Sequence, residues 1–228
     1  MRSRTASEQL MMSDQFVNQI DQRFQSRAEF ACPVADRHED RRVILLALLH
    51  FFWAIGLYSA ALWLPQVVSR LGLGNETVGW ALAVPALLGA AAMYAWGSHS
   101  DRTKRRRRHA MIANLVGAAG LTGSALLKQP ALAMMSITVG MVGIYCYSAV
   151  FYPIPQAILR GPGAASGIAF VTAFSNLAGF AGTYLVGWLN ERFGNFTYAL
   201  LALATSLLIS TVLLSFVPHD VELEEPRP

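Results

Sequence analysis

Six long stretches without Asp, Glu, Lys or Arg constrain this chain of 228 residues more than any other feature of its sequence. Most of the charged residues lie in three clusters instead, at positions 1–42, 101–108 and 220–227. The uncharged stretches are Val43–Ser69, Thr77–Ser100, His109–Leu127, Gln129–Leu159, Gly161–Asn190 and Phe193–His219. Each exceeds the roughly 18 apolar-dominated residues that a helix needs to cross a hydrocarbon core about 30 Å thick. The sequence therefore predicts an all-α integral membrane protein built as a six-transmembrane-helix bundle, and it excludes a water-soluble globular enzyme.

The predicted organisation has a polar region, six spans and a tail. We expect the spans at about residues 43–68, 78–96, 110–127, 131–152, 167–189 and 198–216. Residues 1–42 form a polar N-terminal region, and residues 217–228 form an acidic cytoplasmic tail. In the polar region, apolar residues recur every fourth position at Met12, Phe16, Ile20 and Phe24, which is the spacing of a short amphipathic helix. A poorly ordered leader is the alternative.

Lys and Arg are unequally divided between the two sides of this predicted bundle, ten against three. The richer side holds Arg37, Arg41, Arg42, Arg102, Lys104, Arg105–Arg108 and Arg160, and the other holds Arg70, Lys128 and Arg192. Cytoplasmic loops carry an excess of basic residues, so we expect both termini in the cytoplasm of a multi-pass protein of the cell (inner) membrane. The net charge of +4 comes mainly from a run between two spans, and it does not indicate a nucleic-acid partner.

Sequence signals of enzymes and metal sites are missing. No cluster with metal-ligand spacing, nucleophile–base pair or phosphate-binding glycine loop occurs, and the two cysteines, Cys32 and Cys146, have no paired spacing. We therefore expect no catalytic activity, no cofactor and no metal.

Polar side chains inside two spans are candidates for function. His50 lies well inside the first span, where histidine can exchange a proton near neutral pH; a hydrogen-bonded structural histidine is the alternative. Thr172 and Asn176 lie one helical turn apart in the fifth span, among small residues that let helices approach closely. Because polar groups are costly in hydrocarbon, this helix is expected to face protein or a water-filled cavity.

The segment Gly97–Arg106, between the second and third spans, fits the pattern G-x-x-x-D-R-x-x-[KR]-[KR]. It resembles the signature loop of the major facilitator superfamily, which joins the second and third helices of a six-helix unit. Three further runs, Gly56–Pro65, Phe151–Pro155 and Ala164–Phe180, resemble the seventh, tenth and eleventh helices of its anion:cation symporter branch. That branch includes carriers of tartrate, phthalate and hydroxyphenylacetate.

The resemblance implies a C-terminal six-helix half of a transporter whose family has two such halves, with substrate held between them. It implies secondary transport of a small organic anion, a carboxylate, coupled to protons, and a partner that is a second half or another copy of the chain. Two alternatives stay open: a truncated or split fragment that inserts in the lipid bilayer without transporting alone, and a membrane-embedded scaffold.

The resemblance also assigns residues to roles. It places substrate contacts at Tyr152, Thr172 and Asn176, and a gating role on the loop residues Gly97, Asp101, Arg102, Arg105 and Arg106. In such a gate, Asp101 would meet the unpaired N–H groups where residues 161–163 open the fifth span, with Arg105 or Arg102 in support. For Arg106–Arg108 the alternative is a basic loop that only sets the topology.

Overall fold

The computed structural model describes residues 37–70, 75–159 and 164–217. This part of the chain is helical apart from its short connections. The helices are α2 (Arg37–Ser69), α3 (Asn75–Thr103), α4 (Arg106–Leu126), α5 (Pro130–Phe151), α6 (Pro153–Ile158), α7 (Ala164–Phe193) and α8 (Thr197–Ser215). The predicted amphipathic helix at residues 12–24 and the acidic tail from residue 218 lie outside the described residues.

Within the described residues, six helices are long and apolar enough to cross a membrane: α2, α3, α4, the α5–α6 segment, α7 and α8. The predicted fold class, an all-α six-helix membrane bundle, is confirmed. Several helices extend past the apolar stretches from which we predicted the spans. The helix α3 continues to Thr103 and α7 to Phe193, because leaving the hydrocarbon does not interrupt the backbone hydrogen bonds of a helix.

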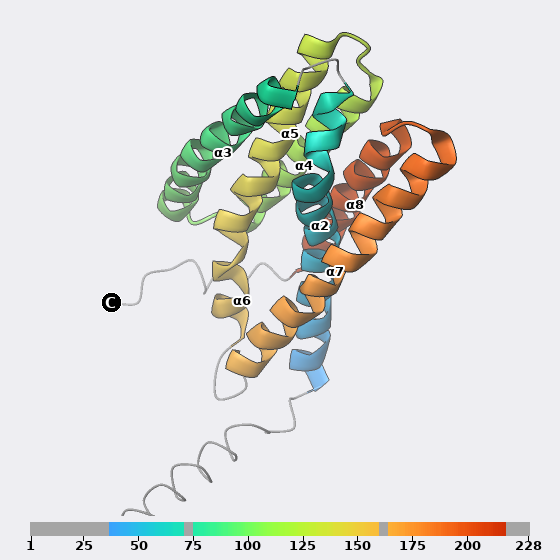
Figure 1. Cartoon of the computed structure of the whole chain (residues 1–228). Coiled ribbons are helices and arrows are strands. Elements are labelled where there is room, and N and C mark those ends of the chain that lie inside the picture. Colours follow the sequence, from blue (N-terminus) through green and yellow to red (C-terminus); the bar gives the residue numbers. More distant parts are fainter. Residues whose placement is uncertain (1–36, 71–74, 160–163, 218–228) are drawn as a thin grey trace, which may run out of the picture.

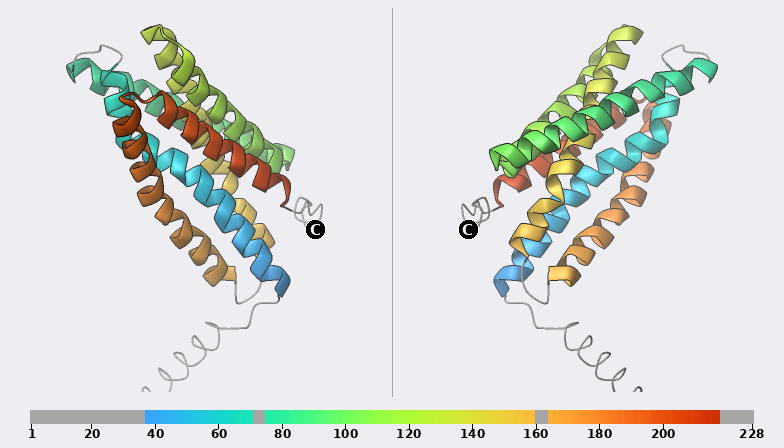
Figure 2. Two further views of the ribbon diagram at one scale, coloured as in Figure 1. Left: turned by 90° about the vertical axis from the view of Figure 1, so that its right-hand side faces the viewer. Right: turned by 90° about the vertical axis from the view of Figure 1, so that its left-hand side faces the viewer.

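The helices form a bundle with two outer members (Figure 1). In its centre, α4 packs on α5 and α8, and α2 packs on α8. The helix α3 leans on α5 at one edge and α7 on α2 at the other, as the views in Figure 2 also show. Only 17% of the spanning part of α3 and of α7 is buried, against 50–56% in the other spans. These two outer helices therefore present most of their surface outward.

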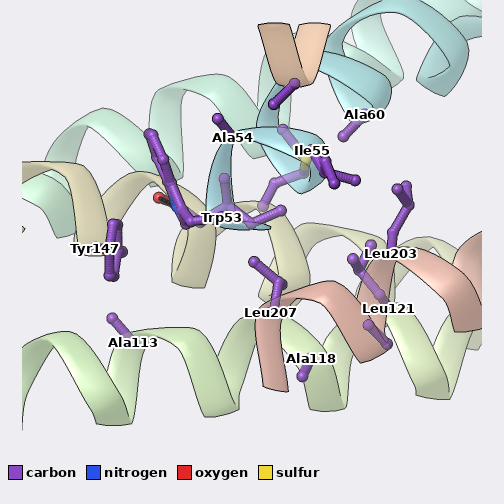
Figure 3. Close-up of a cluster of buried hydrophobic side chains, with 14 of the residues drawn as sticks. Trp53, Ala54, Ile55, Ala60, Ala113, Ala118, Leu121, Tyr147, Leu203 and Leu207 are labelled. Atoms are coloured by element: carbon purple, nitrogen blue, oxygen red, sulfur yellow. Dashed lines mark hydrogen bonds between the residues drawn. The ribbon is translucent and has the colours of Figure 1, made fainter. Parts of the chain in front are cut away.

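The centre of the bundle is apolar, and a short chain of hydrogen bonds crosses it. Figure 3 shows side chains of α2, α4, α5 and α8 meeting in one interior, among them Trp53, Tyr147 and Leu207. The Asn114 amide donates to the Ser210 hydroxyl at 3.1 Å, and Ser210 donates to the backbone carbonyl of Leu49 at 2.7 Å. Buried polar groups need such partners, so these bonds join α4, α8 and α2 at defined positions.

Glycines bring the backbones of α4 and α5 into direct contact. A Cβ atom added at Gly120 would fall on the backbone nitrogen of Gly140 and lie 2.7 Å from the carbonyl oxygen of Ser136. One added at Gly143 would fall on the backbone nitrogen of Gly117. Small residues at such crossings allow two backbones to touch, which is a principal source of helix association in lipid.

A proline-rich break separates α5 from α6. The helix α5 ends at Phe151, and α6 begins at Pro153 with a second proline two residues later. Proline has no N–H to donate, so the intrahelical hydrogen-bond ladder cannot run through this point unbroken. Tyr152 lies at the break, with its side chain 48% exposed.

Candidate functional site

A hydrogen bond between α2 and α7 marks the first part of the candidate site. The hydroxyl of Tyr58 donates to the side-chain carbonyl of Asn176 at 2.8 Å, and both side chains are exposed on the outward side of the bundle. The ring of Tyr58 packs against α7 at Gly179, where an added Cβ atom would lie 3.5 Å from the ring carbons. The side-chain oxygen of Asn176 is thus held by α2, while its amide nitrogen has no hydrogen-bond partner among the described residues.

Two glycines of α7 pack closely against α2, whereas the Thr172 hydroxyl bonds only within its own helix. A side chain at Gly182 would collide with Ser59, and one at Gly187 would press on the ring of Trp63. Thr172 is exposed and donates to the backbone carbonyl of Ile168 within its own helix at 3.0 Å. Thr172 and Asn176 therefore form a polar strip on the outward surface of a helix that is apolar enough to span a membrane.

The second part of the site is a cage of aromatic rings around His50. The imidazole is 3% exposed and stacks on Phe151, with ring centres 4.1 Å apart, and on Trp53, at 4.8 Å. The Trp53 indole is fixed by donating to the carbonyl of Ile144 at 3.1 Å. Tyr152 approaches His50 edge-on at 5.6 Å. The His50 Nδ1 atom has no hydrogen-bond partner in the described structure, so the predicted alternative of a hydrogen-bonded structural histidine has no bond to support it at this atom.

Two of the predicted site residues, Tyr152 and Asn176, each contact a residue of α2. Asn176 contacts Tyr58, and Tyr152 contacts His50. These two positions of α2 are eight residues apart, about 12 Å along a helix. No contact between Tyr152 and the Thr172–Asn176 strip occurs among the described hydrogen bonds and ring pairs, so the two groups are separate. Tyr58 is a site residue that the sequence reasoning did not select.

The predicted gating loop is mostly helical. Gly97, Asp101 and Arg102 lie in the last two turns of α3, Arg106 is the first residue of α4, and Lys104 makes the turn between them with a φ angle of +57°. Across this turn the Arg106 guanidinium contacts the Asp101 carboxylate at 3.1 Å. In this conformation the partner of Asp101 is therefore Arg106, and not Arg102 or Arg105. The expected contact with residues 161–163 lies outside the described residues.

The neighbouring arginines differ in their contacts. Arg107 donates two hydrogen bonds of 2.8 Å, to the carbonyls of Ser215 and Val217, and so caps the end of α8. Cations are favourable at a helix C-terminus, where carbonyls lack partners. Arg107 therefore joins α4 to the end of α8, while Arg106 forms an exposed ion pair with Asp101 across the turn. Arg108 makes no side-chain hydrogen bond or ion pair within the described residues.

These features define a polytopic membrane protein with a polar strip on an outer helix, a caged histidine and a basic turn at one end. Comparison with known proteins matches residues 44–228 to the family model described as Major Facilitator Superfamily. The chain belongs to that superfamily, and the resemblance predicted from the sequence is confirmed.

Three curated relatives show how similar the chain is to known transporters. Two proteins of Agrobacterium vitis, each named "Putative tartrate transporter", are 40% identical over 174 residues and 36% identical over 173. Each alignment covers 76% of this chain, and 39% and 40% of the relative. A "Quinolone resistance transporter" of Acinetobacter baumannii is 28% identical over 190 residues, 83% of this chain and 44% of the relative. The chain thus spans about two fifths of the length of the curated relatives it matches, and the two Agrobacterium proteins agree with the predicted anion:cation symporter branch.

Proposed function

We propose that this chain supplies one six-helix half of a secondary transporter for a small organic anion, a carboxylate, and that it works with a second six-helix half or with another copy of itself. The observation that carries the proposal is the Thr172–Asn176 strip, because polar side chains on the outward surface of a spanning helix need water or protein beside them. A second half packed against this surface would enclose a route that the strip lines.

The chemistry of the strip suits a carboxylate that another half would anchor. The free amide N–H₂ of Asn176 and the hydroxyl of Tyr152 are neutral donors for carboxylate oxygens. The apolar stretches contain no Lys or Arg, so a charge that balances the anion would come from the partner half. The tartrate named for two relatives is our first candidate substrate.

Radiolabelled tartrate uptake tests this function. Cells that carry the chain together with a six-span N-terminal half from a relative are expected to accumulate label above vector-only cells, and unlabelled dicarboxylates, but not choline or glucose, are expected to compete. Uptake no higher than that of vector-only cells, in cells whose membranes contain both halves, would overturn the proposal. It would favour the second candidate, a fragment that inserts without transporting, which the coverage of about two fifths of each relative also allows.

For His50 we propose a role in proton coupling. In the described residues, the titratable side chains around it are those of Tyr147 and Tyr152, and no charged group contacts it. The positive charge of a protonated imidazole would therefore have no counter-charge until an anion or an acidic group of the partner half came near. Binding of the anion would then favour binding of the proton, which is how two ligands become coupled. We expect His50→Gln to flatten the pH dependence of uptake while membrane insertion stays normal. A pH profile identical to that of the unmodified chain would exclude the role.

For the turn between α3 and α4 we propose a gate in which Asp101 exchanges partners. Its carboxylate is 63% exposed, and an exposed ion pair contributes only about 0.2–1 kcal/mol, so the contact with Arg106 can break easily. We expect Asp101→Asn to lower the maximal uptake rate at least about threefold with little change in membrane abundance. Full uptake by this variant would remove the gate. Both termini lie on the same side as this turn in our proposal, which places that side in the cytoplasm of a bacterial inner membrane.

A further inference from the structure

We propose that the groove between α3 and α4 binds an anionic phospholipid, with one acyl chain in the groove and the phosphate at the basic turn. This inference is independent of the transported substrate. The groove has a volume of about 400 Å³ and lies between Ala92–His99 of α3 and Ile112–Val116 of α4, with Val142–Cys146 of α5 as its floor. It exists because α3 packs on α5 but touches α4 only lightly.

The chemistry and the length of the groove fit one acyl chain in one leaflet. Its lining is almost wholly apolar, and the side chains of Ile112 and Val116 at its rim are exposed on spanning helices. From Ala92 to His99 it runs about 10 Å along α3, at 1.5 Å per residue. Half of a hydrocarbon core about 30 Å thick is about 15 Å, so the groove lies within a single leaflet.

Only one end of the groove is polar. His99 lines that end, next to the ring of His109 at 5.1 Å, and the Trp96 indole spans from α3 to the backbone carbonyl of His109 at 3.2 Å. Tryptophan is typical of the level where hydrocarbon meets headgroups, and histidine likewise presents a polar tip beside an apolar body. The headgroup of a lipid in the groove would therefore lie beside the α3–α4 turn.

The charge at this end selects an anionic headgroup. Arg102 follows His99 by three residues on α3, and Arg108 precedes Ile112 by four on α4, so each shares a face with a groove residue. Both are exposed, and neither side chain makes a hydrogen bond or ion pair within the described residues. The one acidic side chain described nearby, Asp101, is paired with Arg106. Two unpaired cations at the mouth of an apolar groove complement a phosphate attached to an acyl chain.

Photo-crosslinking tests the site. The chain, purified and reconstituted in phosphatidylcholine vesicles with a minor share of phosphatidylglycerol, would receive trace phosphatidylglycerol or phosphatidylcholine carrying a diazirine in the acyl chain. Peptide mapping is expected to find crosslinks within residues 92–99, 112–116 and 142–146. We expect the phosphatidylglycerol probe to label these peptides at least about fivefold more than the phosphatidylcholine probe, since each basic residue near a headgroup contributes about 1 kcal/mol.

Two test variants, each with a matched control, probe the basic headgroup end and the apolar groove separately. The double variant Arg102→Gln/Arg108→Gln is expected to lower labelling by the phosphatidylglycerol probe about fivefold or more. The control Arg41→Gln/Arg42→Gln removes two exposed arginines from α2 and should leave this labelling unchanged. Ala95→Trp fills the groove and should reduce labelling by both lipids, while Ala90→Trp, on an exposed part of α3 outside the groove, should not. Circular dichroism and gel filtration would verify the fold of each variant. Equal labelling by the two lipids, or equal losses in test and control variants, would overturn the proposal.

Discussion

Replacing Gly120 with leucine is expected to destabilise the bundle more than any other single change that we consider. The added Cβ would overlap the backbone nitrogen of Gly140 and lie 2.5 Å from its Cα. Backbone atoms cannot rotate away as a side chain can, so α4 and α5 must separate and lose their contact. Overpacking costs about 1–3 kcal/mol in ordinary cores, and we expect the upper end of that range or more, about 3 kcal/mol.

Thermal unfolding of the chain in detergent, followed by gel-filtration fluorescence, measures this effect. Gly79→Leu is a matched control, because nothing lies within 4 Å of the position where its Cβ would be. Gly79→Leu should leave the midpoint near that of the unmodified chain, whereas Gly120→Leu should lower it strongly or prevent recovery of folded protein. Equal midpoints for the two variants would show that α4 and α5 do not approach each other as closely as described.

Replacing Asn176 with alanine is expected to weaken anion binding by the assembled transporter about tenfold. The change removes the amide that Tyr58 holds in place, and a hydrogen bond of this kind contributes about 0.5–1.5 kcal/mol, up to about a factor of ten in affinity. Tyr58→Phe keeps the ring against Gly179 but leaves Asn176 unanchored, so we expect a smaller rise in KM. Because both changes act through one amide, the double variant should resemble Asn176→Ala alone.

Uptake kinetics over a range of tartrate concentrations provide these KM values. Thr205→Ala is the control, since Thr205 is also an exposed polar residue of a spanning helix, and its hydroxyl bonds only to Leu201 of the same helix. A KM for Asn176→Ala no higher than that of Thr205→Ala, at equal abundance in the membrane, would contradict a substrate contact at this position.

The fold class was predictable because lipid imposes a simple rule on sequence. A span must be long and nearly free of charge, and the six stretches between the charged clusters satisfy that rule without any knowledge of packing. Helix–helix geometry was less accessible. The small residues of α7 attracted attention in the sequence, yet the glycines that bring two backbones into direct contact are Gly117, Gly120, Gly140 and Gly143 of α4 and α5. Composition alone cannot tell which glycines of different helices face each other.

The site shows the same limit at the level of single residues. Asn176 was selected as a polar residue of a spanning helix and because the resemblance places a substrate contact there, but its hydrogen-bond partner, Tyr58, is 118 positions away. Tyr58 lies in the run Gly56–Pro65, which resembles the seventh helix of the symporter branch. A search of the first span for aromatic side chains with a polar group would have identified Tyr58 as a candidate. For Asp101 the sequence analysis named Arg105 or Arg102 as the supporting arginine, whereas the tight turn at Lys104 brings Arg106 to it.

Accessibility of a cysteine at position 172 tests most directly whether the polar strip of α7 lines the transport route. Thr172→Cys and Leu208→Cys, each with Cys32 and Cys146 replaced by serine, lie at similar depths, eight residues from the start of α7 and seven from the end of α8. In cells that carry both halves, a membrane-impermeant thiol reagent is expected to label Cys at 172, to be blocked there by tartrate, and to leave position 208 unlabelled. Labelling at 172 that is as low as at 208, or that tartrate does not affect, would contradict the account.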